Sequence, residues 1–541
     1  MLLKIDGNIK NTKETNYWEN EDYLIWWEGL IFIPGILSGK DSVKFLIKLL
    51  KNSNLSSATD ALSGMFSCIL FDKKKKEYYA FSDNSRRSNI YYNSNCISTS
   101  FIELVKYSSP IRDDLDFSSI IEFIITGKIF GINTFFNNIK NVKADEILVI
   151  DSKGISSRSK KLENIYEKDM SINDFLREMK KIAFSLQNKK ISIDLTGGVD
   201  TRLITLIFHY AGLQFETALS GISGHPDIEI PKEVSKILGL QYYITYHKVN
   251  SETLFKDLKA TFTCYDGLRD VIEQHREYQL FKDRKSRGVE ISISGFTGQL
   301  YKDQNTWRAA AKTIFSSDWK NILTKDLVYS GLVGWGFDPN LPCFLFSERY
   351  KSICLNYKNN LYSHILNNYS YNNRFKMSDK ILYEYSVRTP DIRYCPLLER
   401  KIVPYGISMD WKDRLLIRDY RKIITKYNKS IAKIKTTRAS TSASSEFVYI
   451  ISDIIKTCNY LIFYKIRENK KMMKTAFFIN TNFDDRIYTI GKKIVINNNY
   501  IDCLKNINLL DHGLKMVDIP DKYMGRIITL GMLVKDFIWN K

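Results

Sequence analysis

Small, hydroxylated and acidic residues meet between two strongly apolar segments in the stretch "ISIDLTGGVDTRLITL". Thr196 and Thr201 offer hydroxyl groups, and Asp200 adds a carboxylate. Gly197 and Gly198 let the backbone approach a ligand closely. The apolar run before them is typical of a buried strand, and the run after them of a buried helix. Because free N–H groups and the helix dipole at such a junction favour an anion, the stretch predicts a phosphate-binding loop.

The carboxylate in this loop indicates a cation. Asp200 would repel a phosphate unless Mg²⁺ lay between them, so it is predicted as a metal ligand. The loop matches neither the Walker A pattern G-x-x-x-x-G-K-[ST] nor the dinucleotide pattern G-x-G-x-x-G. The alternative is an ordinary turn whose glycines only supply backbone freedom. The strand before it and the helix after it favour the phosphate site.

The elements around the loop alternate between strands and helices. Strands are expected over 191–195, 215–220, 241–246 and 290–294, and helices over 201–211, ending at Gly212, and 227–238, ending at Gly239. This alternation predicts βαβ units and a parallel sheet. Ligands in such sheets bind at the carboxyl ends of the strands, and both "LTGGVD" and "SGFTG" follow such ends.

The first part of the chain, to about residue 150, is rich in strand patterns instead. We expect a hairpin of strands 65–71 and 78–81, a strand 146–150 followed by a turn, and between them a helix opened by Asp116 or Ser118 and closed by Gly127. Residues 305–435 have a mainly helical pattern, 433–446 form a basic and then small, polar loop, and an apolar helix ends the chain. Three domains follow from these changes of pattern: 1–160, 170–440 and 441–541.

Composition indicates which partners and which cellular compartment to expect. A net charge of +20 accompanies a chain that is lysine-rich throughout, without an RNA-binding aromatic signature or a zinc finger, so a nucleic-acid partner is not expected. No apolar run reaches the roughly 18 residues of a membrane span, and the N-terminus lacks a signal peptide, so a cytoplasmic protein is expected. The eight cysteines form no C-x-x-C pair and are interpreted as reduced, mostly buried thiols.

Five stretches in order along the chain resemble one family. "LTGGVDTR" is similar to the pyrophosphate loop of the ATP pyrophosphatases, and especially to the L-T-G-G-x-D-S-R of the asparagine synthetase family. The other four are "GMFSCILFDKKKKEYYAFSD", "NTFFNNIKNVKADEILVID", "SGFTGQL" and "CPLLERKIVPYGISMDWKDRL". The resemblance covers most of the chain.

The resemblance implies two folds and two activities. The N-terminal domain would be an α+β, antiparallel-sheet domain like the Ntn hydrolases, which releases ammonia from glutamine. The C-terminal domain would be an α/β domain of the PP-loop, adenine nucleotide α-hydrolase type that uses ATP and Mg²⁺ to adenylate a carboxylate. An amine then displaces AMP and forms an amide.

Site residues carry over position by position. Asp200 would hold Mg²⁺, with Thr196, Gly197, Gly198 and Thr201 around the pyrophosphate. The end of the next strand would face adenine, and the loop after the fourth strand would complete the site; these positions are Leu219, Ser220 and Gly295. The family also has a lysine that stabilises negative charge, for which the candidates here are Lys435 and Arg438.

Three positions depart from the family pattern. Leu2 stands where glutamine-using members have a nucleophilic cysteine, so no glutaminase activity is expected. Gln299 replaces the acid that supplies the second metal ligand, and an amide oxygen binds Mg²⁺ more weakly. Phe296 offers no proton acceptor where some members have Glu or Tyr.

The sequence thus favours an ATP-dependent, AMP-forming amide ligase with a silent glutaminase domain. The amine would be ammonia or an amino group on a peptide or sugar-linked substrate. The acid would be a small-molecule or peptide carboxylate, with a peptide precursor or carrier as the expected partner, and a homodimer is left open. The alternative is a nucleotide-binding or scaffold protein that has lost catalysis.

Overall fold

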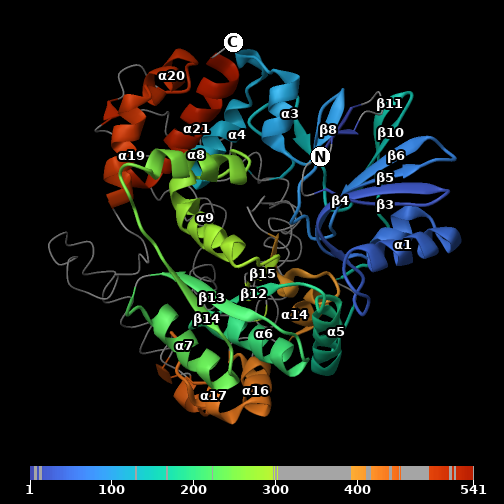
Figure 1. Cartoon of the computed structure of the whole chain (residues 1–541), viewed down its shortest axis with the longest axis vertical. Helices are drawn as coiled ribbons and strands as arrows, with labels where there is room; N and C mark the ends of the chain where they lie inside the picture. The colour runs from blue at the N-terminus through green and yellow to red at the C-terminus, as the bar shows by residue number, and fades with distance from the viewer. Residues whose placement is uncertain are drawn as a thin grey trace, which may run out of the picture.

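A computed structural model gives the fold of the chain (Figure 1). The residues that it describes are 1–4, 9–10, 15–127, 129, 131–165, 168–221, 223–295, 298, 301, 392–409, 413, 416–437, 441–449, 451–452, 486–510, 515–516 and 519–539.

Two antiparallel sheets occupy the N-terminal part of the chain. In the described residues one has the strand order β2-β1-β8-β7-β9 and the other β11-β10-β6-β5-β4-β3. The strands are β1 (Leu2–Lys4), β2 (Ile9–Lys10), β3 (Asn16–Glu19), β4 (Tyr23–Phe32), β5 (Ser63–Asp72), β6 (Glu77–Ser82), β7 (Tyr91–Tyr92), β8 (Cys96–Ser98), β9 (Lys140–Asn141), β10 (Glu146–Asp151) and β11 (Gly154–Ser159). The expected hairpin is confirmed as β5 and β6, which pair antiparallel through Cys68 and Phe81.

The two sheets lie face to face between helices. Leu3 and Ile97 of one sheet share a buried apolar cluster with Trp26, Ile69 and Leu148 of the other. Helix α1 (Lys40–Asn52) and the short α2 (Leu55–Ala58) cover the outer face of the second sheet. Helices α3 (Phe101–Ser108) and α4 (Phe117–Thr126) cover the first. Asp116, and not Ser118, caps α4 through the Ser119 amide, and Gly127 ends it with a left-handed backbone.

A parallel sheet follows, with the order β14-β13-β12-β15-β16. Its strands are β12 (Ile191–Asp194), β13 (Glu216–Gly221), β14 (Tyr242–Tyr246), β15 (Ile291–Ile293) and β16 (Ile392–Tyr394). The first four confirm the expected strands. The fifth, Ile-Arg-Tyr, falls in a region where the sequence pattern favoured helix, because the charged Arg393 at its centre interrupts any apolar run.

Helices cover both faces of this sheet (Figure 1). On one face lie α6 (Val199–Tyr210) and α7 (Pro226–Leu238), with α5 (Ile172–Ser185), α14 (Val403–Ser408), α16 (Arg418–Tyr427) and α17 (Lys429–Lys433) packed in the same core. On the other lie α8 (Leu254–Cys264) and α9 (Val271–Ser286). The crossover from β14 to β15 skips past β12 and β13, so the α6–α7 and α8–α9 pairs lie on opposite faces.

The C-terminal helices join the two parts of the molecule. Helices α19 (Arg486–Asn497), α20 (Tyr500–Asn506) and α21 (Met524–Val534) share one buried apolar cluster with α3, α4, α8 and α9. The Arg526 guanidinium donates to the Ile124 carbonyl oxygen at 2.7 Å. Among the described residues, no helix combines the length and apolar character that crossing a bilayer requires.

Candidate functional site

The glycine stretch forms a closed turn between β12 and α6. The Thr196 amide donates to Oγ1 of Thr201 at 3.0 Å, and the Gly198 amide donates to Oγ1 of Thr196 at 3.2 Å. The two threonine hydroxyls lie 3.1 Å apart. The Gly197 amide donates to Oδ1 of Asp227 on α7 at 3.1 Å. Both hydroxyls predicted for this site therefore hold the turn itself, together with a carboxylate from the next crossover.

The turn places the N-terminus of helix α6 at the carboxyl edge of the sheet. Helix α6 begins at Val199, and its N-cap is Gly198, which has no side chain to form a cap. The first amides of such a helix need partners from outside, and its dipole favours negative charge. Asp200 lies in this first turn. The predicted anion site is therefore supported by the local geometry of α6.

The loop after β15 presses on the same turn. A Cβ on Gly295 would lie 2.7 Å from Cγ2 of Thr201, and a Cβ on Gly298 would overlap the Asp200 carboxylate. The Gly298 amide donates to the Gly295 carbonyl at 3.2 Å, which folds this loop into a tight turn. The two glycine-containing loops predicted from sequence are thus brought into contact, with the Asp200 side chain between them. Gln299 and Phe296 lie outside the described residues.

Residues 434–437 form a strap across the glycine turn. The Thr437 amide donates to the Gly197 carbonyl at 3.1 Å. The buried guanidinium of Arg202 donates to the carbonyl oxygens of Ile434 at 2.9 Å and Lys435 at 3.1 Å. Burial lowers the pKa of Arg202 to about 10, which still leaves it protonated at neutral pH.

Of the two cations predicted to be catalytic, Lys435 lies on this strap. Lys435 is exposed, and its backbone carbonyl is the group that Arg202 binds. Arg438 lies outside the described residues. A catalytic role for either side chain stays a prediction.

The residues predicted to face adenine lie on the neighbouring strand. Leu219 and Ser220 are near the carboxyl end of β13, next to β12 in the sheet. Ser220 is 5% exposed, and its hydroxyl has no hydrogen-bond partner among the described residues. A buried polar group without a partner is costly, so Oγ of Ser220 is a candidate for a ligand contact.

A buried ion network lies directly before the glycine turn. Asp194 ends β12 and binds two guanidinium groups, Arg284 of α9 and Arg393 of β16, at 2.5 and 2.9 Å. Burial alone would raise the pKa of Asp194, but these two cations bring it below its usual range. Arg393 also binds Glu277 at 2.7 Å. Asp194 is therefore held as a carboxylate with both oxygens engaged.

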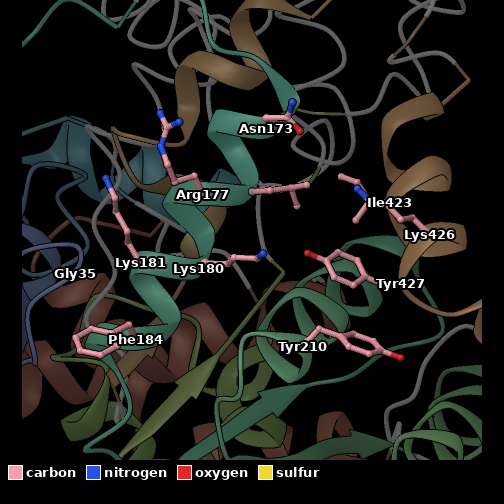
Figure 2. A pocket seen from close by; sticks show the side chains of 11 residues that line it. Gly35, Asn173, Arg177, Lys180, Lys181, Phe184, Tyr210, Ile423, Lys426 and Tyr427 are labelled. Carbon is pink, nitrogen blue, oxygen red and sulfur yellow. The ribbon is translucent and has the colours of Figure 1, made fainter.

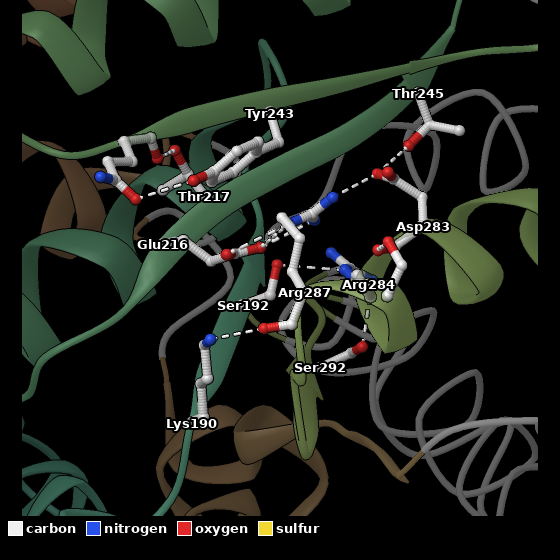
Figure 3. A network of polar contacts seen from close by, with 12 residues as sticks. Lys190, Ser192, Glu216, Thr217, Tyr243, Thr245, Asp283, Arg284, Arg287 and Ser292 are labelled. Atoms are coloured by element: carbon white, nitrogen blue, oxygen red, sulfur yellow. Dashed lines mark hydrogen bonds and ion pairs between the residues drawn. The ribbon is translucent and has the colours of Figure 1, made fainter.

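Arg284 fixes helix α9 to two strands of the sheet (Figure 3). Its guanidinium donates to the hydroxyls of Ser192 at 3.0 Å and Ser292 at 3.1 Å. At the C-cap of α9, Arg287 forms a two-pronged contact with Glu216 on β13, the shortest distance being 2.8 Å. These contacts fasten the C-terminal end of α9 to β12, β13 and β15.

The position of the expected nucleophile in the N-terminal sheets carries an aliphatic side chain. Leu2 is on β1, paired with Ser98 of β8. The thiol of Cys68 on β5 is buried, and burial raises its pKa well above the usual range. Cys96 is buried on β8. The Cys68 thiol is therefore not poised to form the thiolate that nucleophilic attack requires.

The described residues fit a metal only as part of a nucleotide complex. They contain no group of three or more His, Cys, Asp or Glu side chains arranged to hold an ion. Magnesium bound to nucleotide phosphates needs only one or two carboxylates, because phosphates and water supply the other ligands. Asp200 meets that requirement.

Sequence reasoning missed three residues that shape the turn. Asp227 and Thr437 bond to Gly197 from segments 30 and more residues away. Arg202 carries a detectable signal, since it is an arginine in an otherwise apolar helix. For Asp227 and Thr437 no local pattern exists, because exposed acids and threonines are common at helix ends and in loops.

Comparison with known proteins gives weak likenesses only. Neither a protein-family model nor a curated protein matches the sequence. Among solved structures, NMN synthetase from Francisella tularensis is similar to this chain at 16% identity and a TM-score of 0.19. The match covers 25% of this chain and 58% of the synthetase. Glutamine-dependent NAD+ synthetase from Acinetobacter baumannii is similar at 11% identity and a TM-score of 0.18, and the match covers 36% of this chain and 39% of that enzyme.

A third structure covers more of the chain. Glutamine phosphoribosylpyrophosphate amidotransferase from B. subtilis is similar at 8% identity and a TM-score of 0.17, and the match covers 55% of this chain and 59% of the amidotransferase. This chain thus spans less than two thirds of each of the three structures. At these TM-scores the likenesses assign neither fold nor function, and the family resemblance rests on the sequence motifs.

Proposed function

We propose that this protein is an ATP-dependent ligase that activates a carboxylate as its acyl adenylate and transfers the acyl group to an amine. The observation that carries the proposal is the uncapped N-terminus of α6 at the carboxyl edge of a parallel sheet, with Asp200 in its first turn. The carboxylate oxygen would attack the α-phosphorus of ATP and release pyrophosphate. The amine would then displace AMP.

Each element of the site has a task in this reaction. The open amides of α6 would bind the departing pyrophosphate. Ser220 and Leu219 on β13 would contact the adenine side of ATP. Arg202 and the strap would keep the glycine turn in one shape by anchoring residues 434, 435 and 437. Asp200 would hold Mg²⁺, which supplies charge neutralisation on the phosphates.

We propose further that glutamine is not the source of the amine. The two antiparallel sheets between helices support a domain of the Ntn hydrolase type, but Leu2 has no nucleophile. The buried Cys68 thiol does not replace it, since burial holds its pKa well above the usual range. We expect no glutamate release from glutamine in an ammonia and glutamate assay. Glutamate release at a rate comparable with AMP formation would contradict this.

The rival proposal is a nucleotide-binding protein without turnover. It is favoured by the internal bonding of the turn, because the amides of Thr196, Gly197 and Gly198 all donate to protein side chains. Three amides that a phosphate could have engaged are therefore occupied. The two proposals differ in product: the ligase forms AMP and pyrophosphate, and the rival binds Mg-ATP and returns it unchanged.

One variant tests the common basis of both. Asp200→Ala is expected to weaken Mg-ATP binding in titration calorimetry by about tenfold or more, because a phosphate-bound cation loses its carboxylate. Asp174→Ala is the matched control, since Asp174 is also acidic and lies in the first turn of a helix, α5, but outside the site. ATP–pyrophosphate exchange with candidate carboxylates then separates ligase from rival. Equal Mg-ATP affinity in both variants and the unmodified protein would overturn both proposals.

A further inference from the structure

A second concave surface lies at the other end of α6. The cavity has a volume of about 910 Å³ and is lined by α5, the C-terminal end of α6, and α16. Helix α6 has 12 residues, so this groove lies roughly 18 Å from the glycine turn along the helix axis. We refer to it as the α5–α16 groove; its lining residues include Arg177, Lys180, Lys181, Phe184, Tyr210 and Tyr427, together with Lys426.

The α5 wall of the groove carries three cations (Figure 2). Arg177 and Lys181 lie on one side of α5, and Lys180 points across the groove toward Tyr427. Lys426 adds a fourth positive charge from α16. Asp174 binds Arg177 at 2.6 Å and Glu178 binds Lys181 at 2.8 Å. Four cations less two carboxylates leave a net charge of +2, carried by Lys180 and Lys426.

The facing wall, formed by the ends of α6 and α16, carries two stacked rings. Tyr210 and Tyr427 stack with their ring centroids 5.1 Å apart, whereas Phe184 lies at the end of α5 on the first wall. Tyr210 is 47% exposed and Phe184 46% exposed. Large apolar side chains that gather at the rim of a concave surface are typical of a binding site rather than of free surface.

We propose that the α5–α16 groove binds an acidic peptide segment of a partner protein, with carboxylates toward Lys180 and Lys426 and an apolar side chain toward Tyr210 and Tyr427. An extended peptide presents successive side chains in opposite directions, so carboxylates on one side would reach Lys180 on α5 while apolar side chains on the other would reach Tyr210 and Tyr427, with Lys426 beside them on α16. The net charge of +2 suits a segment with about two carboxylates. This inference does not depend on the ligase reaction, because the groove shares no residue with the candidate site.

The same count argues against nucleic acid. Non-specific binding to nucleic acid is driven by neutralising several phosphates, commonly about six to ten. Two cations without carboxylate partners are too few for that, even though the aromatic rings could stack on bases. Single-stranded RNA is therefore a competing ligand to be tested, not the proposed one.

The test uses fluorescence anisotropy of the full chain with a labelled peptide, Gly-Ser-Glu-Phe-Asp-Leu-Glu-Ser-Gly. A second peptide replaces Glu and Asp by Gln and Asn, and a third replaces Phe and Leu by Ala. The double variant Lys180→Glu, Lys426→Glu reverses the charge of the groove. Its control, Lys48→Glu, Lys493→Glu, makes the same change in net charge on the exposed faces of α1 and α19.

We expect the acidic apolar peptide to bind, and each altered peptide to bind about tenfold more weakly or worse. The groove variant should lose binding by a similar factor, while the control variant keeps it. Tyr427→Ala should also weaken binding, since it removes one stacked ring. Absence of binding by the acidic peptide, equal binding of the Gln/Asn peptide, equal loss in the control variant, or tighter binding of a single-stranded oligouridylate would each overturn the proposal.

Discussion

Gly197 and Gly198 are neighbours whose environments differ. A Cβ on Gly197 would meet Cγ2 of Thr437 at 2.5 Å and Oδ1 of Asp227 at 3.1 Å. A Cβ on Gly198 would meet only Oγ1 of Thr196, at 3.3 Å, and its backbone φ of −77° suits any residue. The first glycine is thus required by the packing of the strap, and the second by nothing in the protein itself.

This difference gives a prediction at a single residue. Gly197→Ala should lower the free energy of unfolding by about 1–3 kcal/mol, because an added methyl group in a closed contact forces the strap outward. Gly198→Ala should change it by less than about 1 kcal/mol, and should affect Mg-ATP binding instead. Urea denaturation of the two variants, followed by circular dichroism, makes the comparison. Equal stability of the two variants would show that the strap does not rest on Gly197.

The residue types of the turn could be read from the sequence, but their partners could not. Two glycines between a strand and a helix have a local signature, and both lie where that signature put them. The role of each hydroxyl differs from expectation, since Thr196 and Thr201 bond to the turn. Whether a hydroxyl faces a ligand or the backbone depends on a few tenths of an ångström, which spacing does not encode.

At the scale of elements, helix α9 is attached to the sheet by two arginines in different surroundings (Figure 3). Arg284 is buried and bonds to Ser192, Ser292 and Asp194. Arg287 is partly exposed and bonds to Glu216 and Asp283. Removing Arg284 leaves the buried Asp194 carboxylate with Arg393 as its one guanidinium partner and leaves one of its oxygens unpaired, whereas Asp283 beside Arg287 is reached by water.

We therefore expect unequal losses from equal substitutions on one helix. Arg284→Met should lower the free energy of unfolding by about 3–5 kcal/mol. Arg287→Met should lower it by less, about 1–2 kcal/mol, because Arg287 is more exposed than Arg284 and water reaches its partner Asp283. Chemical denaturation with urea measures both. A loss for Arg287→Met as large as that for Arg284→Met would mean that the Asp194 network is not what holds α9.

Sequence periodicity predicted four strands of this sheet and missed β16. Strands β12 to β15 and helices α6 and α7 have clear apolar periods and flanking glycines. Strand β16 has three residues, and only its hydrogen bonds to β15 define it. Arg393 on that strand completes the Asp194 network, so the missed element also carried a missed residue.

At the scale of the whole molecule, Glu399 joins the parallel-sheet part to the N-terminal sheets. It is 5% exposed and accepts a hydrogen bond of 2.8 Å from the Gly64 amide on β5. Burial raises its pKa to about 7, and the Gly64 amide opposes this shift. Between pH 4.5 and 7 the folded protein therefore holds a proton that the unfolded chain releases.

The sign of this shift sets a pH dependence. The stabilisation from protonated Glu399 is complete below the unfolded pKa of 4.5 and is lost as pH rises to about 7. Glu399→Gln lacks this proton, so the stability of the unmodified protein relative to it should fall across that window, by on the order of 3 kcal/mol at most. Thermal unfolding at several pH values measures the difference, with the exposed Glu252→Gln as control. A difference that rises with pH would contradict the assignment.

Contacts between residues this far apart in the sequence could not be predicted from the sequence. The sequence motif around Glu399 was recognisable, but its partner is 335 positions away on β5. The same holds for Asp266, which accepts hydrogen bonds from Ser100 and the first amides of α3. Pairings between distant segments follow from how whole layers dock, and a single sequence contains no local trace of them.

The bond between the Thr437 amide and the Gly197 carbonyl has a consequence for how motion at the glycine turn can be followed. An amide proton exchanges with deuterated water only when its bond is broken, so its exchange rate reports how often the strap leaves the turn. The exchange rate of the Thr437 amide proton therefore measures the opening of the turn, and it can be observed without knowing any substrate. A ligand that closes the turn would lower this rate, and a ligand that needs the strap displaced would raise it.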